Sequence, residues 1–144
     1  MKWRRKLCLE LSAYDSKTSH KLIRLLECEQ EEIAIGNVLG NKQVTLKIST
    51  MNHIYNSGHI TGIDKRGVFV GNELSAKDLI EIKDVIEMPD LVIRTRPNDR
   101  NGNRRVKLEK QMVKRHRLIL EITDKGEISV VTYFNIKNKL PPEG

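Results

Sequence analysis

The sequence is poor in aromatic residues and in cysteine, and both scarcities narrow what the chain can do. Its 144 residues include one Trp, three Tyr and two Phe, which argues against a platform of stacked rings for single-stranded nucleic acid. The two cysteines, Cys8 and Cys28, form no Cys-x-x-Cys pair and do not cluster with histidine. We therefore expect neither a disulfide nor a zinc site, and predict two reduced cysteines packed as small apolar groups.

Long apolar runs are also absent. No stretch approaches the roughly 20 apolar residues that cross a bilayer. Residues 2–6 are mostly basic, and the apolar run that follows them is interrupted by Glu10. A signal peptide needs about 7–15 uninterrupted apolar residues. We expect a cytoplasmic protein, or one delivered into the cytoplasm of a target cell, with no membrane partner. No cluster of Asp, Glu and His indicates a metal site and no glycine-rich loop indicates a phosphate cradle, so no cofactor is expected.

Positive charge is abundant and concentrated. Residues 94–117 carry a net charge of +8, which exceeds the +7 of the whole chain. Such a concentration on an otherwise balanced chain is typical of a protein that binds a polyanion; the alternative is a solubilising surface. The basic residues of this segment are Arg94, Arg96, Arg100, Arg104, Arg105, Lys107, Lys110, Lys114, Arg115 and Arg117.

The hydrophobic pattern changes from helical to strand-like along the chain. Helical spacing predicts helices over residues 16–31, 50–56 and 75–88, and alternation predicts a strand over residues 44–49. Residues 33–38 fit a short strand or a turn. Four further strands are expected at residues 91–95, 104–110, 115–123 and 127–136, and the short links between them favour antiparallel neighbours. We predict one compact α+β domain: an N-terminal helical extension (1–43) and a core (44–140) with a four-stranded antiparallel β-meander.

Alternation within the strands divides the charged residues from the apolar ones. In the third of the four strands, Leu118 and Leu120 share one face with His116, and the arginines on either side of His116 share the other. We therefore predict an apolar face against the helices, a basic face toward solvent, and a packed, hydrogen-bonded His116. In the last strand both rows mix apolar and polar residues, and a bulge between Val131 and Thr132 would change the alternation.

Four segments, taken in order, indicate a family. The first is a strand followed by MNHIYNSGH, in which a His-Ile pair precedes a second His. The second, ELSAKDLIEIKDVIEMPDLVI, is a helix that ends in a Pro-Asp pair before a strand. Basic strands follow, and RLILEITDKGEISVVTYF is a hairpin that ends in a Val-Thr-aromatic stretch. From about residue 44 to residue 135 the chain resembles the barnase–EndoU–colicin–RelE-like nucleases of phages and bacterial toxin systems.

The resemblance implies a metal-independent ribonuclease with N-terminal helices on a four-stranded sheet. In this chemistry the RNA 2′-hydroxyl attacks the adjacent phosphorus and leaves a cyclic phosphate. A base and an acid move the two protons, and cations stabilise the charged intermediate. On this resemblance the catalytic candidates are His53 and His59 as acid or base, Arg115 on the phosphate, and Thr132 and Tyr133 as orienting hydroxyls.

The remaining basic residues of the strand region are candidates for binding the RNA backbone. They are Arg94, Arg96, Arg104, Arg105, Lys107, Lys114 and Arg117. The main hypothesis is an endoribonuclease toxin that cuts tRNA or mRNA. A non-enzymatic nucleic-acid-binding module that uses the same basic face is the alternative, and an acidic immunity protein or antitoxin is a possible partner of that face. A structural role is the competing interpretation for His53, His59 and Thr132.

Overall fold

A computed structural model describes residues 2–38, 41–60, 62–63, 65–68, 73–96 and 102–136. Within these residues the order of elements follows the expected change from helices to strands. The elements are α1 (Lys2–Ser12), α2 (Lys17–Leu26), β1 (Glu32–Val38), β2 (Lys42–Lys47), α3 (Ile48–Asn56), α4 (Ala76–Ile80), α5 (Ile82–Glu87), β3 (Leu91–Arg94), β4 (Arg104–Gln111), β5 (Arg115–Ile122) and β6 (Ile128–Ile136).

The strands form one mixed sheet in the order β1-β2-β6-β5-β4-β3. The α+β class is confirmed, and β3 to β6 pair antiparallel in chain order. The prediction of a four-stranded antiparallel sheet is wrong, because six strands take part and β2 pairs with β6 in parallel. Short links reveal the direction of consecutive strands only. They carry no information on β2 and β6, which are separated by most of the chain.

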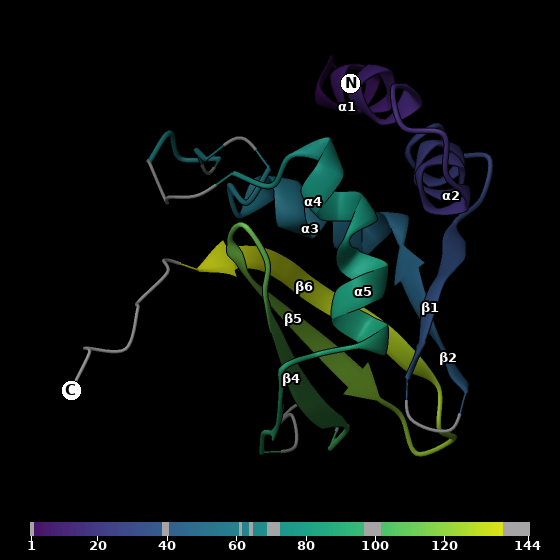
Figure 1. Ribbon diagram of the computed structural model, residues 1–144, viewed down its shortest axis with the longest axis vertical. Helices are drawn as coiled ribbons and strands as arrows, with labels where there is room; N and C mark the ends of the chain where they lie inside the picture. Colours follow the sequence, from purple (N-terminus) through teal and green to yellow (C-terminus); the bar gives the residue numbers. More distant parts are fainter. Residues whose placement is uncertain are drawn as a thin grey trace.

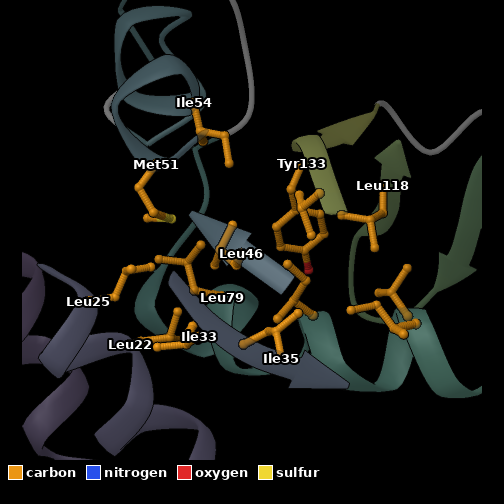
Figure 2. Packing of buried hydrophobic residues seen from close by; sticks show 14 of the residues in the cluster. Leu22, Leu25, Ile33, Ile35, Leu46, Met51, Ile54, Leu79, Leu118 and Tyr133 are labelled. Atoms are coloured by element: carbon orange, nitrogen blue, oxygen red, sulfur yellow. The ribbon is translucent and has the colours of Figure 1, made fainter. Parts of the chain in front are cut away.

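The helices pack on one face of the sheet. Helix α5 lies against β1, β4 and β5, and α2 lies between α1 and β1; Figure 1 shows α5 in front of the strands. We call the sheet face toward α5 the inner face and the opposite one the outer face. The core beneath the helices is continuous, and Figure 2 shows Leu22 and Leu25 of α2 on one side and Leu118 of β5 on the other, with Leu46 between them.

Side-chain caps explain where two helices begin. Ser16 closes a capping box with Ser19 at the start of α2, and Ser75 closes one with Asp78 at the start of α4. The predicted helix after Ser75 is interrupted at Glu81, which separates α4 from α5. Helix α3 begins earlier than predicted, directly after β2, and no side chain caps it.

A bulge in β6 changes which side chains face the core. The pairing of β5 with β6 shifts register between Ile119 and Leu120, so that Val131 becomes the extra residue. Val130 on one side of the bulge and Tyr133 on the other are both buried on the inner face. Thr132 and Phe134 consequently lie on the outer face. The bulge expected near Thr132 is confirmed.

Two smaller expectations have different outcomes. Both cysteines are free, but only Cys8 is partly buried; Cys28 is exposed, at a positive φ of 62°. The prediction that both cysteines are packed in the core is therefore wrong for Cys28. In the part of the chain that the structure describes, no helix is long and apolar enough to cross a membrane.

Candidate functional site

The outer face of β4 and β5 carries much of the positive charge that the sequence concentrates. Strand register places Lys107 opposite Ile119, Arg105 opposite Glu121, and Arg117 opposite Glu109. Four cationic side chains and two carboxylates share this face of the two strands, which leaves a net positive charge. They are Arg105, Lys107, Arg115, Arg117, Glu109 and Glu121.

Glu109 holds two of these arginines in place. One carboxylate oxygen accepts a hydrogen bond from Arg115 Nε at 2.8 Å, and the other accepts from Arg117 Nε at 3.0 Å and lies 2.9 Å from Arg117 Nη2. Burial raises the pKa of Glu109, but the hydrogen bonds and charges of Arg115 and Arg117 outweigh it and hold the pKa below its usual range. Glu109 therefore stays ionised and fixes both guanidinium groups on the sheet.

His59 stacks on the aromatic ring of the same face. Its ring lies 4.9 Å from the Phe134 ring, with 22° between the planes. The Arg117 guanidinium carbon lies 5.8 Å from the centre of the same Phe134 ring. Phe134 therefore brings an imidazole and a guanidinium to one place on the outer face.

The backbone around His59 is fixed on both sides. Gly58 takes a positive φ of 80° and ends the helical turn after α3; an L side chain rarely adopts this conformation. The His59 amide donates to Ile54 O at 3.1 Å, and the His59 carbonyl accepts from the Leu74 amide at 2.7 Å. The histidine thus has a defined place although it lies beyond the end of α3.

The charge of His53 reaches His59. Burial lowers the pKa of His59, and the charge of His53 lowers it further. His53 is itself exposed, on the last turn of α3. A neutral imidazole with a second histidine nearby is equipped to accept one proton while the other group supplies one.

Thr132 and Lys107 complete the outer-face group. The Thr132 hydroxyl oxygen is buried and makes no hydrogen bond to the residues described, and Thr132 stands two positions before Phe134 on the same face. Lys107 is half-buried and forms no ion pair within the described part of the chain. Lys107 therefore has its ammonium group available for an anionic ligand, whereas the buried Thr132 oxygen is closed to one.

Several residues of the expected site lie elsewhere. Tyr133 is fully buried on the inner face, because neighbouring residues after the bulge point to opposite sides. Lys114 reaches Glu73 O and Asp78 Oδ2 instead of the outer face. Arg94 and Arg104 share the strand parity of the inner face, and Arg96 lies beyond the end of β3.

His116 shows the packed role that the sequence predicted. It is fully buried on the inner face and hydrogen-bonded to Tyr133. The structure links His59 to Arg117 through Phe134, and Arg117 to Arg115 through Glu109. The charge of His53 reaches His59, and Thr132, Lys107 and Arg105 lie on the same face of the sheet.

Sequence reasoning overlooked Phe134 and Glu109 as members of this group. Glu109 was visible as the one carboxylate on the basic face of β4. Phe134 was hidden because its face depends on the bulge at Val131. Once the alternation of β6 is restarted after Val131, Phe134 falls opposite Arg117, and the pair becomes predictable.

Comparison with known proteins identifies the family of the chain. Residues 33–141 match the family PBECR3, described as phage-Barnase-EndoU-ColicinE5/D-RelE like nuclease3. The match begins in β1 and covers both the sheet and the segment that carries His53 and His59. Neither a curated protein nor a solved structure matches the chain. The chain belongs to the phage-Barnase-EndoU-ColicinE5/D-RelE like nuclease3 family.

Proposed function

We propose that this nuclease is a metal-independent endoribonuclease whose reaction takes place on the outer face, between His59 and the arginines of β5. The observation that carries the proposal is the stacking of His59 on Phe134 beside Arg117. Through this contact the imidazole of His59, which can transfer protons, lies near the guanidinium group of Arg117, which can bind phosphate. The two come from segments that are far apart in the sequence.

The roles follow from charge and exposure. His59, whose pKa is lowered, is the general base that takes the proton of the RNA 2′-hydroxyl. His53, which is exposed on the last turn of α3 and whose charge reaches His59, is the general acid that protonates the leaving 5′-oxygen. Attack forms the bond from the 2′-oxygen to phosphorus, and loss of the 5′-oxygen leaves a 2′,3′-cyclic phosphate.

The cations act on the phosphate. Arg117 and Arg115, held by Glu109, stabilise the extra negative charge that develops on phosphorus. Thr132, whose hydroxyl oxygen is buried, supports this face beside Phe134 and does not itself reach the phosphate. Lys107 and Arg105 bind flanking phosphates, which contribute affinity without sequence preference. The water that later opens the cyclic phosphate is not required for strand cleavage.

The biological setting is a further part of the proposal. A nuclease that cuts tRNA or mRNA in the cytoplasm of its own or a target cell acts as a toxin. An acidic immunity protein or antitoxin would then cover the positively charged outer face. The support for this part is the charge of that face and the phage association of the family.

The test is incubation of the purified chain with total RNA in EDTA, followed by analysis of the product ends. We expect cleavage with cyclic phosphate ends, and a loss of at least about 100-fold in His59→Ala and in Arg117→Ala, as for removal of a proton-transfer group or an anion-stabilising donor. His20→Ala is the matched control, because His20 is an exposed histidine at the start of α2. Salt-sensitive RNA binding with no cleavage would instead favour the non-enzymatic binding module.

A further inference from the structure

The inner face carries a second cluster of ionisable groups, which shares no residue with the outer-face site. Asp78 of α4, Glu81 at the α4–α5 junction and His116 of β5 each offer one atom, and these atoms lie within 4.8 Å of one another. His116 is fully buried, and the side chains of Asp78 and Glu81 are 10% and 20% exposed. The sequence separates these residues by up to 38 positions, which is why no metal-ligand pattern was visible.

Hydrogen bonds fix which nitrogen of His116 carries a proton. The Tyr133 hydroxyl donates to the Asp78 carbonyl at 2.8 Å, so it can only accept from His116. His116 Nδ1 therefore donates to the Tyr133 oxygen. In a neutral ring the other nitrogen, Nε2, then carries a lone pair. Nε2 is buried and has no hydrogen-bond partner among the described residues.

This lone pair points at two carboxylates. Nε2 lies 3.6 Å from Asp78 Oδ1 and 3.7 Å from Glu81 Oε2. Such distances are too long for hydrogen bonds. They are close to the separation of about 3.3–3.6 Å between neighbouring ligand atoms that each lie about 2.0–2.2 Å from a tetrahedral ion. A nitrogen lone pair that faces two carboxylates repels them, and a bound cation removes this repulsion.

We propose that Asp78, Glu81 and His116 bind one divalent transition-metal ion, with Zn²⁺ as the best match to one imidazole and two carboxylates. Three protein ligands leave the fourth tetrahedral position to water. The ion ties the α4–α5 junction to the central strand β5, and its role is structural.

The surroundings of the three ligands are those of a metal site. Metal-binding histidines usually donate their other ring N–H to an oxygen that orients them, as His116 does to Tyr133. Asp78 Oδ2 is held by the Ser75 amide at 2.9 Å and lies 3.4 Å from Asn135 Nδ2 and from Lys114 Nζ, which leaves Oδ1 to the ion. Two cations approach the ligands: Lys114 lies near Asp78, and Lys77 Nζ lies 3.9 Å from Glu81 Oε1, which leaves Glu81 Oε2 to the ion.

The test measures Zn²⁺ uptake by the untagged full chain after chelator treatment and removal of the chelator. His53 and His59 can bind Zn²⁺ themselves, so the titration is made in a His53→Gln/His59→Gln background. Calorimetric titration with ZnCl₂ should give one ion per chain. The melting temperature should rise by about 5–10 °C at free Zn²⁺ about a hundredfold above Kd, and Co²⁺ should give the visible spectrum of a tetrahedral ion.

Two variants separate ligation from general charge attraction. Glu81→Gln removes a ligand, and Asp84→Asn removes the same charge from the third residue of α5, which is not one of the three ligands. We expect Glu81→Gln to weaken Zn²⁺ binding at least about tenfold and Asp84→Asn to leave it within about twofold. Tyr133→Phe should weaken it about 10–100-fold while the circular dichroism spectrum still shows a folded chain.

Three results would overturn the site. The first is that the chain with both histidines substituted takes up no Zn²⁺. The second is that Glu81→Gln and Asp84→Asn weaken Zn²⁺ binding equally, and the third is that Glu81→Gln binds Zn²⁺ with full affinity. None of these results depends on whether the chain cleaves RNA, because binding is measured without substrate.

Discussion

Replacing Phe134 by leucine tests whether the ring on β6 positions His59. The change keeps most of the apolar volume and removes the ring that stacks on His59 and lies under Arg117. An aromatic pair contributes about 0.5–1.5 kcal/mol beyond its burial, and an exposed cation–π contact about 0.5–1 kcal/mol. Phe134→Leu should therefore lower the free energy of unfolding by about 1–2.5 kcal/mol.

The effect on cleavage should be larger than this loss of stability suggests. A misplacement of a reacting group by about 1 Å can cost about 100-fold in rate. We expect kcat/KM for RNA to fall about 10–100-fold in Phe134→Leu, measured at a temperature at which the variant is fully folded. Phe134→Tyr, which retains the ring, is the matched control and should stay within about threefold of the unchanged protein.

The pH profile gives an independent check. Burial and the charge of His53 lower the pKa of His59, so the neutral base persists below its ordinary value of about 6.5, and the acidic limb of kcat/KM should lie below pH 6.5. Phe134→Leu exposes the imidazole and should move this limb upward. A histidine whose pKa is lowered in the folded state favours folding only while it is neutral. His59 should therefore contribute to stability above pH 6.5, and this contribution should be lost as the pH falls. Unchanged activity and an unchanged limb in Phe134→Leu would refute the assignment of His59.

Three further predictions concern the surrounding residues. Lys107→Ala should weaken RNA binding and lower the salt slope of log K by about 1, whereas Arg94→Ala, on the opposite strand parity, should change neither; filter binding at several salt concentrations measures both. Glu109→Gln should cost about 1–3 kcal/mol at pH 7, because two charge-assisted hydrogen bonds are lost. The lowered pKa keeps Glu109 ionised in the folded chain after the unfolded chain protonates near its ordinary value of 4.5, so this cost should begin to shrink as the pH falls below 4.5 and vanish only below the lowered folded-state pKa; urea unfolding over a pH series downward from pH 7 would show this. Gly36→Val should lower the melting temperature, because even the Cβ would lie 3.3 Å from Ile86 Cγ2 and the added methyl groups overpack that contact.

Local signals in the sequence predicted the strands well, and also the helix starts at Ser16 and Ser75, but not α1 or the early start of α3. Alternation located β4, β5 and β6 within a residue or two, and the Ser75–Asp78 capping box is present as expected. The prediction failed for strand pairing between segments that are far apart in the sequence. The parallel pairing of β2 with β6 joins Val44 to Ile128 and Thr45 to Ser129, and no property of either segment alone specifies that partner.

The candidate site was predictable to the extent that it depends on alternation. Arg115 and Arg117 were placed on the correct side because β5 is regular, and His116 fell between them on the other. Tyr133 was misplaced because it was grouped with its neighbour Thr132, and adjacent strand residues face opposite ways. Lys114 was misplaced because it lies in the turn between β4 and β5, where no alternation applies. Its direction is set by Asp78, a partner 36 positions away.

The bulge at Val131 lets β5 and β6 present two different groups of side chains, one on each face of the sheet. Beyond it, Phe134 meets His59 and Arg117 on the outer face, while Tyr133 meets His116 and the Asp78 carbonyl on the inner one. His116 stands between the two arginines of β5, so whatever fixes His116 also fixes the strand that presents them. Rigid support from the far side of a sheet is what a positioned phosphate-binding pair needs. Changes to the inner cluster should therefore reach RNA cleavage through the position of these arginines, with the acidic limb of the pH profile, which reports His59, left in place.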